Sequence, residues 1–356
     1  MSSDERRDFA QGPACPIPIS DYPTVLLAHG GGGRLTQMLI EGMFLKAYGN
    51  PTLDSLHDGA RLDVDGARLA FSTDSYVIHP IFFPGGDIGS LAVHGTVNDL
   101  AMCGARPIGL SAGFILEEGF PMEQLWRVTS SMRDAAREVG VPVVTGDTKV
   151  VDRGKGDGVF INTTGIGLVL PGVEVSPVRA RPGDAIVVSG SIGVHGIAIM
   201  SLREGLEFET RLASDTAPLH DLVATILAAG GSDVHVLRDP TRGGVASALN
   251  EIAEKADVGV ELDETKIPLR EDVRGACEIL GLDPLYVANE GICLAVVARS
   301  VADDVLAATR SHARGRDGAV IGEVVAEHPG RVFMESRIGG RRIVDMLSGE
   351  QLPRIC

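Results

Sequence analysis

At 356 residues, with 44% hydrophobic and 22% charged residues, the chain has the composition of a globular protein with two domains, each able to bury its own core. Its net charge of −16 at pH 7, without a basic stripe, argues against nucleic acid or an anionic membrane as partners, and a bound nucleotide would need bridging divalent cations. No apolar run reaches the ~18 residues of a membrane-spanning helix, and five scattered cysteines without a CxxC pair favour a reducing cytoplasm over a disulfide frame or a zinc site.

The N-terminal half is expected to consist of a short arm and an α/β domain. Residues 1–22 are polar and then proline-rich, without the apolar core of a secretory signal, so we expect a flexible arm. Residues 146–149, Gly-Asp-Thr-Lys, are expected to form a turn. In chain order, the elements expected in 23–172 are a strand at 24–28, a helix at 35–47, hairpin strands at 61–64 and 68–72, a helix at 87–102, a strand at 108–116, a helix at 121–139, and strands at 142–145 and 159–170.

A second domain is expected at 173–345, because the segment 171–183 carries three prolines and turn chemistry that are typical of a boundary. Alternating strands and helices in both halves predict α/β or α+β layers. The last eleven residues, 346–356, lack periodicity and are expected to form a flexible tail. The elements expected in the second domain are strands at 185–189, 292–298 and 319–325, a glycine-spaced turn at 190–196, and helices at 218–229, 245–256, 270–280 and 301–310.

Acidic and amide side chains at the ends of elements are candidates for a nucleotide or metal site. Asp74 follows an apolar strand, and Asp147 lies in the Gly-Asp-Thr-Lys turn, where a turn former or helix cap is the competing interpretation. Asn98 and Asp99 lie in an otherwise apolar helix, where burial is costly unless the pair has partners. Asn98 falls on the same helical face as Asp87, so these two could act together; a solvent-facing stripe is the alternative.

Basic and glycine-rich segments suggest how phosphates could be held. Lys149 follows a strand end, where a lysine can neutralise charge on a transferred phosphoryl group, although an ordinary exposed lysine is the alternative. The glycine run 30–33 precedes a helix and could cradle an anion or act as a hinge. Asp239 and Arg242 open another helix: Arg242 could bind phosphate, and Asp239 could simply cap the helix.

A terminal thiol is the most unusual candidate. Cys356 ends a tail that could span up to about 35 Å when extended, far enough to enter the chain's own pocket or that of a partner. A frayed end is the alternative. Arg354 is expected to lower the pKa of this thiol slightly, and the terminal carboxylate to raise it. Glu290 lies at an element edge, where a turn is the alternative, and His94 and His195 lie beside glycines, where a structural role is common.

Together these segments resemble the HypE family of hydrogenase maturation factors, in the superfamily of aminoimidazole ribonucleotide synthetase and selenophosphate synthetase. The resemblance covers nearly the whole chain from about residue 26. The segments that carry it are 29–33, 72–74, 86–89, 95–102, 104–107, 146–151, 239–244, 289–291 and the terminal Pro-Arg-Ile-Cys.

The resemblance implies a two-domain PurM-like fold and a homodimer, in which N-terminal domains pair into an intersubunit β-barrel with ATP at the interface. It also implies ATP-dependent dehydration of a carbamoyl group on the terminal cysteine to a thiocyanate, the source of cyanide ligands for the iron of NiFe-hydrogenases. The implied partners are the carbamoyltransferase HypF, which loads the tail, and a HypC–HypD complex, which receives the cyanide.

The resemblance also suggests roles for individual residues. Cys356 would carry the carbamoyl group, Lys149 would balance phosphoryl charge, and Glu290, helped by His94, would take the amide protons. The predicted Mg²⁺ ligands are Asp74, Asp99 and Asp147. The predicted ATP-binding residues are Asp74, Asp87, Asn98, Asp99, Gly146, Asp147, Thr148, Asp239 and Arg242.

Two other functions are weighed against this one. Selenophosphate synthetase would need a reactive cysteine or selenocysteine with a lysine in its glycine-rich N-terminal segment, and residues 29–34 contain neither. A non-enzymatic carrier would only present Cys356 to partners, and the Asp and Lys positions argue against it. An ATPase assay separates the carrier from the enzyme.

Overall fold

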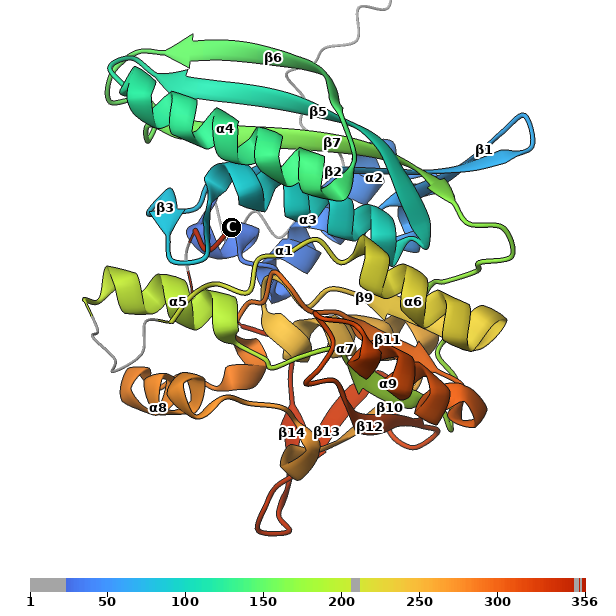
Figure 1. The fold of residues 1–356 in the computed structure, drawn as a ribbon. Helices are drawn as coiled ribbons and strands as arrows, with labels where there is room; N and C mark the ends of the chain where they lie inside the picture. The colour runs from blue at the N-terminus through green and yellow to red at the C-terminus, as the bar shows by residue number, and fades with distance from the viewer. Residues whose placement is uncertain (1–23, 206–211, 349–351, 353) are drawn as a thin grey trace, which may run out of the picture.

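The computed structural model describes residues 24–205, 212–348, 352 and 354–356, so the arm predicted at 1–22 lies outside the described residues. Two large sheets, one in each half of the described chain, build the molecule, and Figure 1 shows the first above the second. The C-terminus lies between them, near α3 (Ile88–Met102) and β3 (Phe82–Phe83). A third, two-stranded sheet pairs β3 with β4 (Gly86–Asp87). None of the helices in the described ranges has the length and apolar character needed to cross a bilayer.

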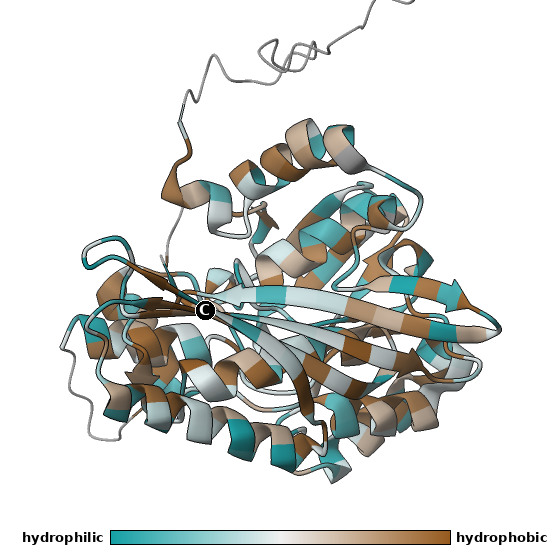
Figure 2. Ribbon diagram, turned by 90° about the horizontal axis from the view of Figure 1, so that it is seen from above, coloured by the Kyte–Doolittle hydropathy of each residue, from teal (hydrophilic) through white to brown (hydrophobic). Residues whose placement is uncertain are grey.

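The N-terminal sheet has five strands in the order β1-β2-β7-β5-β6, antiparallel except for the parallel pair β5 and β6. Its strands are β1 (Ala60–Val64), β2 (Ala67–Tyr76), β5 (Ala105–Glu117), β6 (Val143–Val151) and β7 (Val159–Val169). The helices α3 and α4 (Met122–Val139) cover one face. The opposite face, on which Figure 2 looks down, keeps Phe71, Ile115 and Ile166 exposed. Strand alternation explains this, because successive side chains point to opposite faces.

The predicted hairpin, helices and strands of this half are largely confirmed. Asp65 and Gly66 both have positive φ between β1 and β2, as a tight hairpin turn requires. The helix predicted at 87–102 is α3, and Gly104 follows it with φ of 69°. The helix predicted at 35–47 is α1 (Arg34–Leu39), continued by a π-helical segment at Ile40–Phe44 and by α2 (Leu45–Tyr48).

Two predictions for this half are wrong. Residues 24–28 form no strand; a 3₁₀ turn occupies Leu27–Gly30, and an apolar run this short does not settle helix against strand. Gly146–Lys149 is not a turn but the middle of β6. This strand lies at the sheet edge and is exposed along nearly its whole length, so its sequence lacks the buried alternation by which a strand is recognised.

The C-terminal sheet has seven strands in the order β14-β13-β10-β12-β8-β11-β9. Its strands are β8 (Ala185–Val188), β9 (Val234–Arg238), β10 (Gly259–Asp263), β11 (Leu294–Val297), β12 (Ala319–Val325), β13 (Arg331–Glu335) and β14 (Arg341–Val344). The helix α7 (Gly244–Ala256) packs on one face, against Ile186 and Val188. The helices α6 (His220–Gly230) and α9 (Ala302–Ser311) pack on the other, against Ala185 and Val187. Burial on both faces explains why β8 and β11 are continuously apolar.

The predicted strands at 185–189, 292–298 and 319–325 are confirmed as β8, β11 and β12, and four predicted helices as α6, α7, α8 (Glu271–Leu280) and α9. The sequence interpretation missed α5 (Val194–Arg203), which occupies part of the predicted glycine turn, and the strands β9, β10, β13 and β14. Short strands in the second half have little periodicity of their own, and pairing with distant strands stabilises them.

The helix α3 connects the two halves. It packs on β2 and β7, and also contacts α6 and β9 of the second half. Nearly all of its residues are buried, which fits its small and apolar sequence on every face. Asp87 caps its N-terminus: the carboxylate accepts hydrogen bonds from the backbone N–H groups of Gly89 (2.8 Å) and Ser90 (3.0 Å). The polar residues of α3 therefore meet protein groups from both halves.

Candidate functional site

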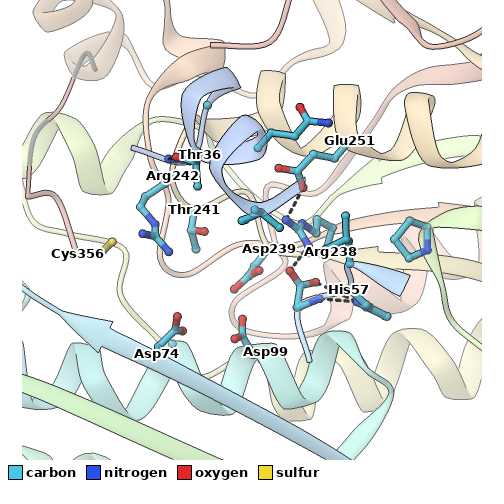
Figure 3. Close-up of a pocket in the computed structure, with 18 of the residues that line it drawn as sticks. Thr36, His57, Asp74, Asp99, Arg238, Asp239, Thr241, Arg242, Glu251 and Cys356 are labelled. Carbon is cyan, nitrogen blue, oxygen red and sulfur yellow. Dashed lines mark hydrogen bonds and ion pairs between the residues drawn. The ribbon is translucent and has the colours of Figure 1, made fainter. Parts of the chain in front are cut away.

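A cavity of about 290 Å³ lies where both halves and the C-terminus meet. Its lining comes from the glycine run before α1, the end of β2, the middle of α3, the loop before α7, the turn before β11, and the last residue. The residues on which the chemistry depends are Asp58, Asp74, Tyr76, Gly95, Asp99, Asp239, Arg242, Glu290 and Cys356. Figure 3 shows Asp74, Asp99 and Asp239 turned toward one another, with Arg242 and Cys356 beside them. The cavity thus combines a carboxylate cluster, a guanidinium group and a thiol.

Three carboxylates from distant parts of the chain lie close together in the cavity. One oxygen each from Asp58, Asp99 and Asp239 lies within 4.8 Å of the others. Burial, and then the neighbouring carboxylates, raise the pKa of Asp99 well above its usual range and that of Asp239 to about 8. Arg238 forms an ion pair with Asp58. Such crowding of carboxylate oxygens fits a divalent cation, because its charge would relieve the repulsion that the arrangement creates.

Asp74 and Tyr76 form the wall of the cavity along β2. The Tyr76 hydroxyl donates a hydrogen bond to Asp74 Oδ2 at 3.3 Å. Burial, opposed by Arg242, raises the pKa of Asp74. Gly95 of α3 faces this pair, and a Cβ there would lie 2.2 Å from the Tyr76 hydroxyl. Glycine is therefore required at 95 for the helix to approach β2 closely.

The sulfur of Cys356 lines the same cavity while the residue stays partly exposed. Burial, opposed by Arg242, raises the pKa of the Cys356 thiol to about 12, and Glu290 and Asp74 contribute in the same direction as burial. Arg242 has its own pKa raised, chiefly by the negative charge that Cys356 carries when it ionises, and its Nη1 donates to the Gly30 carbonyl at 3.1 Å. The docked thiol is therefore protonated at neutral pH.

The prediction that Arg354 lowers the pKa of the Cys356 thiol is wrong. Arg354 forms an ion pair with Asp157, and its Nε donates to the Val77 carbonyl at 2.9 Å. These partners hold the guanidinium away from the sulfur, and Arg242 is the cation that acts on the thiol instead.

Glu290 is buried at the cavity wall, and its Oε1 has no hydrogen-bond partner among the described residues. Burial, followed by the charges of Asp239, Asp215 and Asp74, raises the pKa of Glu290 well above its usual range. Its backbone N–H donates to Asp215 Oδ1 at 3.2 Å, which fixes the turn. A buried carboxyl oxygen without a partner, facing a cavity, is available to a ligand.

Three predicted residues of α3 and its cap lie outside this cavity. Asp87 is occupied as the helix cap, as described above. Asn98 accepts from the Leu219 N–H (2.8 Å) and donates to the Ala217 carbonyl (3.1 Å). His94 Nδ1 lies 3.2 Å from the Thr216 hydroxyl, and burial lowers the pKa of His94 to about 4. Asn98 and His94 bind the segment 216–219, on a different face of α3 from Gly95 and Asp99.

The predicted residues of β6 also lie outside the cavity of their own chain. Gly146, Asp147, Thr148 and Lys149 are all exposed, and Lys149 Nζ lies 2.7 Å from Asp147 Oδ2. The sheet register aligns Gly146 with Asp74 three strands away, about 14 Å at ~4.8 Å per strand. One chain therefore brings Asp74 and Asp99 together without Asp147.

Asp58 was not foreseen from the sequence. It precedes β1 within His-Asp-Gly, which is ordinary turn chemistry, so nothing local distinguishes it. Only its place beside Asp99 and Asp239 reveals it.

Comparison with known proteins assigns this architecture. The AIR synthase related protein N-terminal domain matches residues 56–169, and the C-terminal domain matches residues 181–335. The carbamoyl dehydratase HypE of Azotobacter vinelandii is 58% identical over 94% of this chain and 97% of its own length. The chain belongs to the HypE family. This confirms the resemblance and the two-domain PurM-like fold inferred from the sequence motifs.

Solved structures of HypE proteins share the fold closely. A HypE structure in complex with ATP is 54% identical, with a TM-score of 0.79, over 94% of this chain and 100% of that chain. The HypE chain of a HypE–HypF complex is 47% identical, with a TM-score of 0.83, over 87% of this chain and 99% of that chain.

Proposed function

We propose that this chain uses ATP to dehydrate an S-carbamoyl group on Cys356 to a thiocyanate, the cyanide source for the iron of NiFe-hydrogenases. The observation that carries the proposal is that the Cys356 sulfur lines the same cavity as the carboxylates of Asp58, Asp99 and Asp239. The name carbamoyl dehydratase of close relatives and the ATP complex of a related structure support it.

The reaction removes one oxygen and two protons from the carbamoyl group. Its oxygen attacks the γ-phosphorus of ATP, and ADP leaves. The nitrogen then loses two protons, the carbon–oxygen bond breaks with release of phosphate, and the carbon–nitrogen triple bond forms. Arg242 lies beside the sulfur and can stabilise negative charge on the transferred phosphoryl group.

Glu290 would receive the nitrogen protons. Its free Oε1 can first bind the carbamoyl N–H or oxygen. The pKa of Glu290 is raised partly by the negative charges of Asp239 and Asp74. A cation bound to these two carboxylates would therefore lower the pKa of Glu290 and favour the ionised form that accepts a proton.

Asp58, Asp99 and Asp239 would hold Mg²⁺, with Asp74 at the edge of the same cluster. The ion would supply the positive charge that lets a triphosphate approach this acidic cavity. The clustering of their oxygens supports these ligands over Asp147, which is three strands away from Asp74 within one chain.

A homodimer would give Asp147 and Lys149 their role. The register places both side chains on the open face of the N-terminal sheet, beside Asn162 of β7, where apolar side chains such as Phe71 and Ile166 are also exposed. Pairing of two such faces into an intersubunit β-barrel would cover these groups and bring the β6 residues of one chain to the nucleotide of the other.

The reaction, which we place in the cytoplasm, needs one partner to supply the carbamoyl group and another to accept the cyanide. A carbamoyltransferase of the HypF kind would load Cys356, and a HypC–HypD complex would accept the cyanide. The similarity of this chain to HypE in a HypE–HypF complex supports the first partner.

Mass spectrometry of the C-terminal peptide tests the proposal. After incubation with carbamoyl donor, HypF and MgATP, the carbamoylated peptide should lose the mass of one water, with one phosphate released per carbamoyl group. Cys356→Ala should not be loaded. Lys149→Ala should be loaded without losing water, whereas Lys155→Ala, another exposed lysine of the same domain, should behave as wild type. Loading without any loss of water in the wild type would leave only a carrier.

A further inference from the structure

We propose that His195 and Arg203 are positioning residues that grip the backbone of the C-terminal tail and so place the Cys356 side chain in the cavity. Both belong to α5, and neither touches the sulfur. His195 Nε2 lies 2.8 Å from the Ile355 carbonyl. Arg203 Nη2 donates to the Arg354 carbonyl at 2.5 Å, and its Nε donates to the His79 carbonyl at 2.6 Å. The inference rests on the proposed function of Cys356.

The hydrogen bonds around His195 fix its tautomer. A carbonyl can only accept, so Nε2 must carry the proton. Nδ1, 2.7 Å from the Ser214 hydroxyl, then accepts from that hydroxyl. Ser214 is itself held by its N–H, which donates to the Pro84 carbonyl at 2.8 Å. The fully buried ring also packs edge-on against Phe83, 5.8 Å between centroids. The donor is thus held rigidly.

The tail is recognised through its main chain on both sides. Opposite α5, the Val77 N–H donates to a terminal carboxylate oxygen of Cys356 (3.0 Å) and the His79 N–H to the Arg354 carbonyl (3.3 Å), so the tail runs beside residues 77–79. The carbonyls of Arg354 and Ile355 and one carboxylate oxygen of Cys356 therefore each have a donor. None of these bonds uses the sulfur. His195, Arg203 and residues 77–79 together form the backbone-binding site of the tail, called the seat below. This seat can hold the tail with a free, carbamoylated or cyanated thiol while the side chain remains in the cavity.

This arrangement separates two steps of the proposed cycle. Loading requires the tail to leave the seat, because the docked sulfur lies in a cavity between the two halves of the chain. Dehydration requires the tail to return and hold the carbamoyl group in line with the nucleotide. Weakening the seat should therefore slow dehydration without slowing loading, whereas general damage to the fold would slow both.

The test compares His195→Ala with His195→Gln in the full-length chain, with the free Cys356 thiol for alkylation and with the HypF-carbamoylated chain for dehydration. A buried hydrogen bond contributes about a tenfold change in equilibrium, so His195→Ala should speed alkylation of Cys356 by iodoacetamide about tenfold. Its single-turnover dehydration should slow by about tenfold or more, and its loading should be no slower than in wild type. The glutamine amide can still donate to the Ile355 carbonyl and should restore both rates. Arg203→Met, on the half-exposed end of α5, should repeat the alanine signature even if His195→Ala folds poorly.

Alkylation and dehydration at wild-type rates in His195→Ala and Arg203→Met would overturn the proposal. It would also fail if glutamine behaved like alanine with both loading and dehydration slowed. The alkylation readout does not depend on the reaction: if wild-type protein never dehydrates the carbamoyl group, the proposed function fails, while faster alkylation in the variants still identifies the seat.

Discussion

Ile355→Ala should release the tail from its seat. The Ile355 side chain is only 3% exposed and packs in the N-terminal core with Ile199 and Ala288 of the second half. The substitution removes three buried carbon atoms. At ~0.8 kcal/mol for each, docking should weaken by about 2.4 kcal/mol, or roughly 50-fold. When the tail is undocked, residue 355 no longer occupies that core, so the loss falls on the docked state.

Alkylation of Cys356 measures this release. Under conditions in which the tail opens and closes faster than iodoacetamide reacts, the rate follows the undocked fraction and should rise roughly 50-fold in Ile355→Ala. Peptide mass spectrometry separates Cys356 from Cys103, Cys277 and Cys293, which are buried. Ile338→Ala, at a side chain 95% exposed, is the matched control and should leave the rate unchanged. A rate in Ile355→Ala within about twofold of wild type would refute the burial argument.

Three further predictions concern the same cavity. Docking of the tail raises the thiol pKa of Cys356 from 9.0 to about 12, so docking should be intact below pH 9 and weaken about tenfold between pH 8 and 10. The NMR resonance of an Ile355 methyl group should report this loss of docking, and Cys356→Ser should abolish its pH dependence. Mg²⁺ without nucleotide should raise the Tm, and Asp99→Asn should remove most of that increase in thermal denaturation, because one of three clustered carboxylates loses its charge. Gly95→Ala should lower stability by about 1–3 kcal/mol in urea unfolding and weaken ATP binding by calorimetry, because its methyl group would collide with the Tyr76 hydroxyl; unchanged values would show that α3 can move.

Local chemistry was predictable where it depends on neighbours in the chain. The hairpin at Asp65 and Gly66, the helix from Ile88 to Met102, and the glycine that follows it depend on φ preferences, periodicity and capping. The motifs also identified the family, because each short segment keeps its residues together in the sequence.

The edge strand β6 shows where local patterns fail. Gly146–Lys149 contains turn-forming residues, yet its backbone pairs with β5, and the exposed side chains carry no periodic signal. The π-helical segment at Ile40–Phe44 likewise cannot be distinguished from an α-helix by its sequence pattern.

The sequence by itself determined the terminal thiol, the family, the acidic residues available for chemistry, and most of the regular elements. Only the tertiary structure decided which acidic residues share a cavity. Asp58 and Asp239 lie beside Asp99, whereas Asp87 caps a helix. The tertiary structure also brings the Ile355 carbonyl of the tail within hydrogen-bonding distance of His195. The physical reason is that capping and turn formation act between neighbours along the chain, whereas burial, charge repulsion and carbonyl recognition arise only when remote segments meet.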